Sequence, residues 1–425
     1  MTNIIDCLKE RGLVDAVTSE DLIQHLETPR KVYLGFDPTA DSLHIGSLVG
    51  MVILRWFQKF GHTPVVILGG ATARIGDPGG KNVERPLIDS AVVAYNTTRI
   101  RRHFDAVLDF FVRSAKPIVL NNDDWLSNMP VIDFLRDVGK HFRVGTMIAK
   151  EMVRSRIESE EGISFTEFTY QILQAYDFYH LQMEHGVTLQ LGGSDQWGNI
   201  VSGMDLIRKI SGAQVYGMTF PLLTRSDGKK FGKTEEGTIW LAADRCSPYQ
   251  FYQYFIRVPD ADVIKLMRFL TFMPMQEIRE YEAMLAQKDY VPNTCQKRLA
   301  EEVTRLIHGE EGLAKALKVT EGAAPGSDAA LDPETLRQIA QDMPGASLTL
   351  PEVVDQKYVD LAVKIGLLPS KGEANRLIQN GGAYLNNIRV DDPQHRISQN
   401  DVIGGEFLLF AAGKKKKILL SIREN

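Results

Sequence analysis

A histidine that follows a short polar segment can bind phosphate in this chain. His44 stands two residues before Gly46, where a helical pattern begins after the polar residues 37–42. Free N–H groups and the helix dipole favour an anion at such a point, and Gly46 lets a flat ring approach the backbone. A lone His-x-Gly more often marks an ordinary capped helix with a surface histidine. Its place after a predicted strand therefore carries the phosphate-binding interpretation.

A second candidate phosphate site is the cationic loop of residues 224–234. Gly228 and Gly232 make the loop flexible, and Lys230 and Lys233 lie beside Gly232. A mobile lysine loop can clamp a polyphosphate while charge develops on the leaving group. A solvated basic loop explains the same residues equally well when they are taken alone.

Three polar side chains share one face of a predicted helix. The spacings of Tyr170, Gln174 and Asp177 place them within about 60° of one another. Their helix is otherwise rich in apolar residues, and polar groups are costly to bury without partners. Either a polar ligand or an internal hydrogen-bonded network would supply those partners.

Two glycine-rich segments follow predicted strands. In residues 190–199, Gly192 permits close backbone approach and Asp195 can bond a ribose hydroxyl. In residues 69–81, Asp77 can hold an ammonium group, and the cations that follow can reach phosphates. A glycine turn with Asp195 as helix cap, and a glycine-rich surface loop, are the respective alternatives.

The predicted elements that position these residues indicate an open α/β domain. Residues 31–36 and 64–69 are predicted strands, joined by a helix over about 43–60. The unbroken apolar run at 64–69 is typical of a parallel sheet covered on both faces, and the order strand–helix–strand predicts a right-handed βαβ unit. Further strands are predicted near 117–120, 187–191 and 215–223. Ligand sites of such domains lie at the carboxyl ends of the strands.

The rest of the chain has a different pattern. Helices alone are predicted from about 248 to 319, including a long amphipathic helix over 296–317. An Ala-, Gly-, Pro- and Ser-rich stretch then predicts a linker, with one short helix opening at Asp332-Pro333. The predicted divisions are 1–228 (Rossmann-like catalytic domain), 229–247 (lysine loop and connector), 248–320 (helical domain), 321–350 (linker) and 351–425 (small α+β domain).

Composition excludes several classes of protein. The formal net charge is -5, so any RNA contact must come from local patches. The three cysteines are far apart and form no Cys-x-x-Cys pair, which argues against a protein-ligated metal and a disulfide framework. No secretory signal and no run of about 18 apolar residues is present, so a cytoplasmic protein that does not enter membranes is expected.

Together these segments resemble the class I tyrosyl-tRNA synthetases over nearly the whole chain. Residues 35–46 are similar to the His-Ile-Gly-His signature with its lead-in, 230–234 to the Lys-Met-Ser-Lys-Ser loop, and 192–199 to the ribose and amino-acid segment. One such motif is weak, but the ordered set is specific. Ser47 stands where a second histidine is common, and Leu34 where some members have a cysteine.

The resemblance implies an enzyme that activates L-tyrosine with ATP and Mg²⁺ and passes the tyrosyl group from its adenylate to tRNA(Tyr). It assigns the phenolic hydroxyl to Tyr33 and Asp177 and the ammonium to Asp77, Tyr170 and Gln174. It assigns the adenylate and carboxylate to Gly35, Asp37, Ser47, Gly192, Asp195 and Gln196. It assigns the reacting phosphate to Thr39, His44, Lys81, Arg85, Lys230 and Lys233. Residues 122–160 resemble the insertion that forms a homodimer interface.

The C-terminal module resembles a small RNA-binding fold shared with a ribosomal protein. That resemblance rests on residues 369–386. Lys371 and Arg376 would contact tRNA phosphates. The basic run Lys414, Lys415, Lys416 and Lys417 would do the same. Residues 352–425 carry a net charge of +2 in a chain of net charge -5, although a solvated face remains the alternative.

Three other functions compete with this interpretation. A tryptophanyl-tRNA synthetase has no need for a pair such as Tyr33 and Asp177, which suits a hydroxyl ligand. Small nucleotidyltransferases share a His-x-Gly-His site but lack a C-terminal RNA module of this kind. A non-catalytic RNA-binding relative would have no use for the signature residues His44, Lys230 and Lys233.

Overall fold

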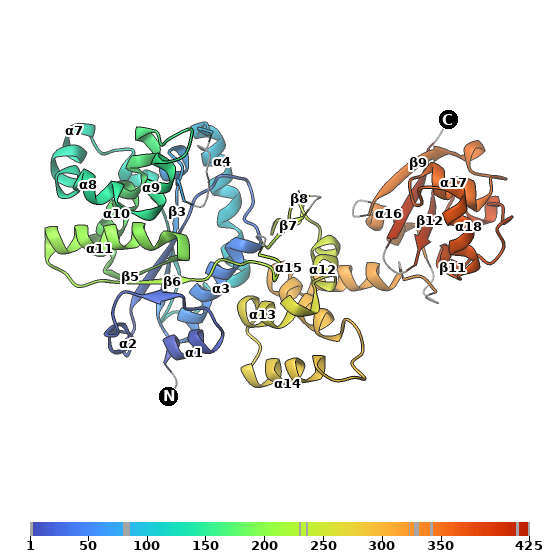
Figure 1. The fold of residues 1–425 in the computed structure, drawn as a ribbon, viewed down its shortest axis with the longest axis horizontal. Helices are drawn as coiled ribbons and strands as arrows, with labels where there is room; N and C mark the ends of the chain where they lie inside the picture. The colour runs from blue at the N-terminus through green and yellow to red at the C-terminus, as the bar shows by residue number, and fades with distance from the viewer. Residues whose placement is uncertain are drawn as a thin grey trace. The chain divides into compact units, whose positions relative to one another are not determined.

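The structure is a computed structural model that divides the chain into two units (Figure 1). It describes residues 3–79, 86–228, 231–234, 237–322, 324–326, 331–340, 343–413 and 416–423. The first unit joins Met1–Cys246 to Phe255–Ile307, and the second joins Ser247–Tyr254 to His308–Asn425.

A six-stranded sheet forms the centre of the first unit. Its order is β1-β6-β5-β2-β3-β4, parallel except for β1 at the edge. The strands are β1 (Ala16–Val17), β2 (Lys31–Phe36), β3 (Thr63–Leu68), β4 (Ile118–Asn121), β5 (Val187–Gly193) and β6 (Tyr216–Phe220). The strand order reverses between β2 and β5, which is the switch point where open α/β sheets bind ligands. The predicted α/β catalytic fold and its five parallel strands are confirmed.

Helices cover this sheet because their apolar faces need burial. Helix α3 (Ile45–Lys59) joins β2 to β3 as expected, and most of its apolar side chains are buried. The long α10 (Phe165–His185) and α11 (Trp197–Ser211) flank β5 in sequence and pack together. The remaining helices before residue 160 are α1 (Ile4–Glu10), α2 (Leu22–His25), α4 (Ser90–Arg101), α5 (His103–Val107), α6 (Asp123–Leu126), α7 (Val131–Asp133), α8 (Val144–Ile148) and α9 (Glu151–Ile157).

The predicted all-helical stretch contains α12 (Pro248–Ile256), α13 (Asp260–Leu270), α14 (Met275–Leu285) and α15 (Thr294–Gly322). The prediction of one continuous helix over 296–317 is wrong, because α15 is interrupted at Gly309, whose φ is +70°. Arg11 holds the end of α13 within the first unit: its guanidinium donates to the carbonyls of Arg268 and Thr271 and lies 4.3 Å from the centre of the Trp56 ring.

The second unit contains a five-stranded sheet of order β11-β10-β12-β13-β9. Its strands are β9 (Gly345–Thr349), β10 (Ala383–Leu385), β11 (Ile388–Arg389), β12 (Phe407–Ala412) and β13 (Lys416–Arg423), and its helices include α16 (Pro333–Ala340), α17 (Tyr358–Lys364) and α18 (Lys371–Gln379). The expected linker is therefore too long, since β9 pairs in parallel with β13. The small residues of this stretch are typical of a linker, but β13 supplies the hydrogen bonds that make residues 345–349 a strand.

One core of the second unit draws on α12. Tyr249 packs with Val319 and Leu336 and with Phe407, Leu409 and Leu419 of the sheet. Residues 247–254 thus complete this unit's core, although more than 50 residues of sequence separate them from the rest of the unit. Among the described residues, no helix has the length and apolar character needed to cross a bilayer.

Candidate active site

A cavity of about 330 Å³ opens at the carboxyl ends of the parallel strands. It lies at the switch point of the sheet, between the ends of β2 and β5 and the start of α3. The predicted residues that line it are Tyr33, Gly35, Asp37, Thr39, His44, Ser47, Asp77, Tyr170, Gln174, Asp177, Gly192, Asp195 and Gln196. Segments spread over more than 160 residues of sequence therefore meet in one place.

Tyr33 and Asp177 give this cavity a buried polar end. Tyr33 is 2% exposed, and among the described residues its hydroxyl has no hydrogen-bond partner. Burial and the nearby Asp177 carboxylate raise the pKa of Tyr33, which keeps its O–H protonated. Burial also raises the pKa of Asp177 to about 7, although Asn122 and Trp125 donate hydrogen bonds to it at 2.9 and 2.7 Å.

The helix that carries Asp177 is fixed at both ends. The Ser164 side chain accepts a hydrogen bond from the Glu167 N–H at the start of α10, and Gly186 ends the helix in the left-handed region at φ +64°. Tyr170, Gln174 and Asp177 face the cavity from this helix, as their spacing predicted.

A chain of hydrogen bonds along the cavity wall connects Tyr170 to Asp177. Tyr170 and Thr72 donate to opposite oxygens of Asp37 at 2.8 and 2.7 Å. Asn122 donates to Thr72 at 2.9 Å as well as to Asp177. The internal network that the sequence left as an alternative is therefore present for Tyr170 and Asp177, and it coexists with an open cavity.

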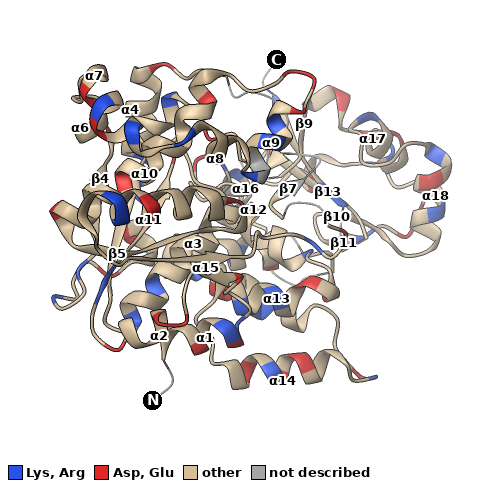
Figure 2. Ribbon diagram, turned by 60° about the vertical axis from the view of Figure 1, so that its left-hand side comes forward, with Lys and Arg blue, Asp and Glu red and all other residues tan. Residues whose placement is uncertain are grey.

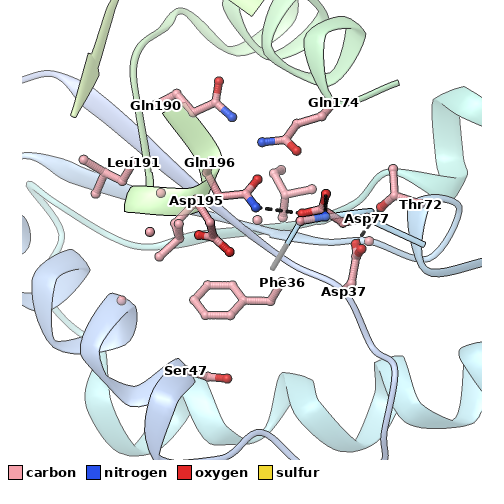
Figure 3. Close-up of a pocket in the computed structure, with 18 of the residues that line it drawn as sticks. Phe36, Asp37, Ser47, Thr72, Asp77, Gln174, Gln190, Leu191, Asp195 and Gln196 are labelled. Carbon is pink, nitrogen blue, oxygen red and sulfur yellow. Dashed lines mark hydrogen bonds between the residues drawn. The ribbon is translucent and has the colours of Figure 1, made fainter. Parts of the chain in front are cut away.

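A second network surrounds Asp77. Its carboxylate accepts from the Gln196 amide at 2.7 Å and from the Gly79 N–H at 2.9 Å. Asn199 donates to both Gln174 and Gln196, at 3.0 and 3.1 Å. Figure 3 shows Gln174, Gln190 and Gln196 around one space, with the Gln196–Asp77 and Thr72–Asp37 bonds dashed. Carbonyl and carboxylate oxygens on this wall suit an ammonium group.

His44 caps α3 at the opposite side of the cavity. Its Nδ1 accepts the Ser47 N–H at 3.3 Å, so the neutral ring carries its proton on Nε2. A Cβ at Gly46 would stand 2.8 Å from the imidazole Cε1. The ring that lies against Gly46 is therefore that of His44 itself. The N-terminus of α3, Thr39 and His44 together offer hydrogen-bond donors to a phosphate.

The lysine loop returns to the same helix start. Beyond β7 (Lys233–Thr234) and β8 (Gly237–Thr238), residues 239–242 run beside the His44 motif, and we call them the anchor segment. The N–H of Ile45 donates to the Ile239 carbonyl at 3.2 Å, and the Leu241 N–H donates to Leu43 at 2.8 Å. The backbone thus brings the two sequence signatures together. Lys81, Arg85 and Lys230, and the side chain of Lys233, lie outside what the structure describes.

The candidate tRNA-binding residues all belong to the second unit. Lys371 starts α18 and forms an ion pair with Asp360 at 2.6 Å, while Arg376 is exposed on the same helix. Figure 2 shows charges of both signs along α18. Lys416 and Lys417 begin β13, whereas Lys414 and Lys415 lie outside the described residues.

Sequence reasoning missed three polar residues that line the cavity: Thr72, Asn122 and Gln190. Gln190 carried a usable sequence signal, because it stands between two leucines in a mostly apolar strand. In the structure its buried Oε1 has no partner among the described residues. Asn122 follows β4 directly, and Thr72 lies four residues after the end of β3. Their place at strand ends was the only available signal.

Comparison with known proteins agrees with this geometry. A family model described as class I tRNA synthetases (W and Y) matches residues 25–323. A tyrosine–tRNA ligase of Protochlamydia amoebophila is 57% identical over 424 residues, with 100% of both chains covered. The chain belongs to the tyrosine–tRNA ligases.

Other relatives extend the match for this tyrosine–tRNA ligase family member. A family model for the tyrosine–tRNA ligase C-terminal domain matches residues 335–420. An Escherichia coli tyrosine–tRNA ligase is 45% identical over 99% of both chains. The structure of a C-terminally truncated mitochondrial tyrosyl-tRNA synthetase of Aspergillus nidulans has a TM-score of 0.67 and 31% identity, covering 74% of this chain and 92% of that one.

Proposed function

We propose that this chain activates L-tyrosine with ATP, releasing pyrophosphate, and transfers the tyrosyl group from the adenylate to the 3′ end of tRNA(Tyr). The observation that carries the choice of amino acid is the buried hydroxyl of Tyr33, which has no partner among the described residues and lies near Asp177. A phenolic hydroxyl can accept from Tyr33 and donate to Asp177. An indole N–H can only donate, so it offers no acceptor to the O–H of Tyr33.

The rest of the tyrosine follows from the second network. Asp77, Gln174 and the Tyr170 hydroxyl hold the ammonium, because each offers an oxygen on the cavity wall. Gln196, Gly192 and Asp195 lie where the carboxylate and ribose must sit. A Cβ at Gly192 would stand 2.7 Å from Gln196 Cβ, so glycine is needed to keep that side chain in place.

Activation needs no protein nucleophile. The tyrosine carboxylate attacks the α-phosphorus, and pyrophosphate leaves with its Mg²⁺, so catalysis consists of positioning and stabilisation of charge. His44 Nε2 and Thr39 donate to the reacting phosphate. Lys81, Arg85, Lys230 and Lys233 neutralise the leaving group, in the roles that their motifs imply. The Mg²⁺ arrives with ATP as part of the substrate.

Tyrosine-dependent exchange of pyrophosphate into ATP tests this function. We expect exchange with tyrosine and little with tryptophan or phenylalanine at equal concentration. Exchange that depends on tryptophan would assign the chain to the other specificity of its family model. No exchange with any amino acid, in a folded protein that binds ATP, would contradict the enzymatic proposal.

The titration of Asp177 predicts how tyrosine binding depends on pH. The ionised carboxylate of Asp177 accepts the hydrogen bond of the phenolic O–H, and burial raises the pKa of this group to about 7. Affinity for tyrosine should therefore fall as the pH drops through 7, by about tenfold between pH 8 and pH 6. Equilibrium binding without ATP measures this, because tyrosine itself changes charge little over that range.

The control for this prediction is Asp177→Asn, which cannot titrate. Its weaker affinity for tyrosine should be nearly constant between pH 6 and 8. A slope that persists in Asp177→Asn would assign the pH dependence to another group.

We propose that α18 contacts the tRNA backbone through Lys371 and Arg376. Changing both to glutamine should lower the slope of log affinity against log salt by about 2, since each phosphate contact contributes about 1. Pyrophosphate exchange should be unchanged, because both residues belong to the second unit. Lys364→Gln is a matched control: Lys364 lies on α17 and is also ion-paired, to Glu352 at 2.9 Å. An unchanged slope would remove α18 from the interface.

We also propose that the insertion mediates a homodimer. Among the described residues, its exposed apolar side chains are Val131, Ile132, Leu135, Val144, Ile148 and Ile157, at 40–68% exposure. Such a group of exposed apolar residues is typical of an interface. Changing Ile132 and Leu135 to aspartate should convert a dimer to a monomer in analytical ultracentrifugation. Val291→Asp, at an equally exposed site (68%), should leave the dimer intact. A monomeric unmodified protein would contradict the proposal.

A further inference from the structure

A cluster of charges surrounds the end of the anchor segment. Arg245 Nη1 donates to one oxygen of Asp41, and Arg99 Nη2 lies 3.8 Å from the other. Arg99 also forms an ion pair with Asp244 at 2.5 Å. The guanidinium carbon of Arg245 lies 4.2 Å from the centre of the Trp240 ring. We call the paired strands β7 and β8 the lysine hairpin. The cluster therefore joins the loop before His44, helix α4 and the chain that follows the lysine hairpin.

This cluster stands outside the cavity. The cavity-lining residues include none of its five side chains. The side chains of Asp41, Arg99 and Arg245 are 25–37% exposed and do not line the cavity in which tyrosine and the reacting phosphate are proposed to bind. Any effect on chemistry must pass through the backbone they hold.

The loop before His44 is held from the α4 side as well. Asn96 of α4 donates to the Pro38 carbonyl at 3.0 Å, and the Ser42 hydroxyl lies 3.5 Å from His103 Nε2. The Ser42 hydroxyl also accepts the N–H of Ala242 at 3.0 Å. Helices α4 and α5 and the anchor segment therefore all contact the same short loop.

The lysine hairpin is attached to the far end of the anchor segment. Ile239 N–H donates to the Gly232 carbonyl at 2.9 Å, and Lys233 pairs with Thr238 in the β7–β8 register. The backbone position of Lys233 therefore depends on where residues 239–242 are held. A displacement of the anchor segment moves the lysine relative to His44.

We propose that Asp41, Arg99 and Arg245 are positioning residues for adenylate formation. They fix the anchor segment, and with it strand β7, against the His44 motif. This inference rests on the proposed function of the lysine hairpin. Partly exposed ion pairs contribute little to overall stability, so the main effect of the cluster falls on geometry rather than on folding.

The test compares Asp41→Asn and Arg245→Gln with the unmodified protein in tyrosine-dependent pyrophosphate exchange. Each variant should lose roughly tenfold in kcat, less than the 10²-fold that a 1 Å misplacement can cost. The Kd for tyrosine should stay within about twofold, because the amino-acid pocket is untouched. An unchanged tyrosine affinity also shows that each variant is folded. The double variant should lose no more than the worse single variant, since both changes release the same segment.

Arg101 provides a matched control, because it lies on α4, the helix that carries Arg99. Arg101 pairs with Asp105 at 2.8 Å and lies 4.9 Å from the Phe110 ring centre, so Arg101→Gln also removes an ion pair and a cation–π contact. It should leave kcat unchanged. Three outcomes overturn the inference: kcat within twofold of the unmodified protein, equal losses in kcat and tyrosine affinity, or losses that multiply in the double variant. Absence of exchange in the unmodified protein would instead refute the proposed function.

Discussion

Replacing Lys233 with alanine should slow tyrosyl-adenylate formation by about 10²–10³-fold, the usual cost of removing one group that stabilises charge in a transition state. Its strand β7 is tied through Gly232 and Ile239 to the anchor segment, so the backbone links this lysine to the segment that runs beside His44. Lys230→Ala should act in the same direction. Single-turnover formation of the adenylate gives the rate.

Tyrosine affinity separates this role from a structural one. Neither lysine is expected near the tyrosine pocket, so the Kd for tyrosine should remain nearly unchanged. Lys315→Ala, which removes an exposed cation in the second unit, should change neither quantity. Equal losses of affinity and rate in Lys233→Ala would show that the loop supports the pocket rather than the transition state.

Replacing Tyr33 with phenylalanine should narrow the preference for tyrosine over phenylalanine in kcat/KM. The loss of one buried hydrogen bond costs about 1–3 kcal/mol, which corresponds to roughly 5- to 160-fold. Most of the change should be weaker activation of tyrosine, whose hydroxyl loses its donor. Pyrophosphate exchange with each amino acid measures the ratio.

Two further variants sharpen this result. Asp177→Asn should harm tyrosine recognition more than Tyr33→Phe. It is preferable to alanine because its amide oxygen keeps an acceptor for one of Asn122 and Trp125, which donate to separate oxygens of Asp177. Tyr216→Phe alters a buried tyrosine of the same sheet that does not line the cavity, and it should leave the ratio unchanged. An unchanged ratio in Tyr33→Phe would remove Tyr33 from the hydroxyl site and weaken the case for tyrosine.

The sequence was most informative where local pattern and chemistry coincide. The apolar run of β3 predicted a buried strand, and the polar stripe of α10 predicted both a helix and the face that lines the cavity. Thr72 and Asn122 could not be predicted as cavity residues, because a polar residue in a loop has no distinguishing pattern until the fold brings two strand ends together. Strand β9 could not be predicted for a related reason: its partner β13 lies some 70 residues away, and only that pairing makes it a strand.

The anchor segment was also invisible to sequence reasoning. The two signature motifs could be recognised separately, about 190 residues apart, but the hydrogen bonds from Ile45 to Ile239 and from Leu241 to Leu43 depend on tertiary structure. The same is true of the Asp41–Arg245 pair, which joins residues with no shared periodicity. Ion pairs and main-chain pairing between distant loops follow from the fold and leave no local signal.

The contribution of Tyr249 to the core around Phe407 and Leu409 has a consequence for chimeric enzymes. A transplant that carries only residues 308–425 into another synthetase would leave behind one wall of that core. Recombination breakpoints should therefore be chosen in pairs, so that Ser247–Tyr254 travels with the C-terminal segment. A host whose own α12 offers a smaller residue than tyrosine should yield a graft that melts at lower temperature and recovers when the tyrosine is restored.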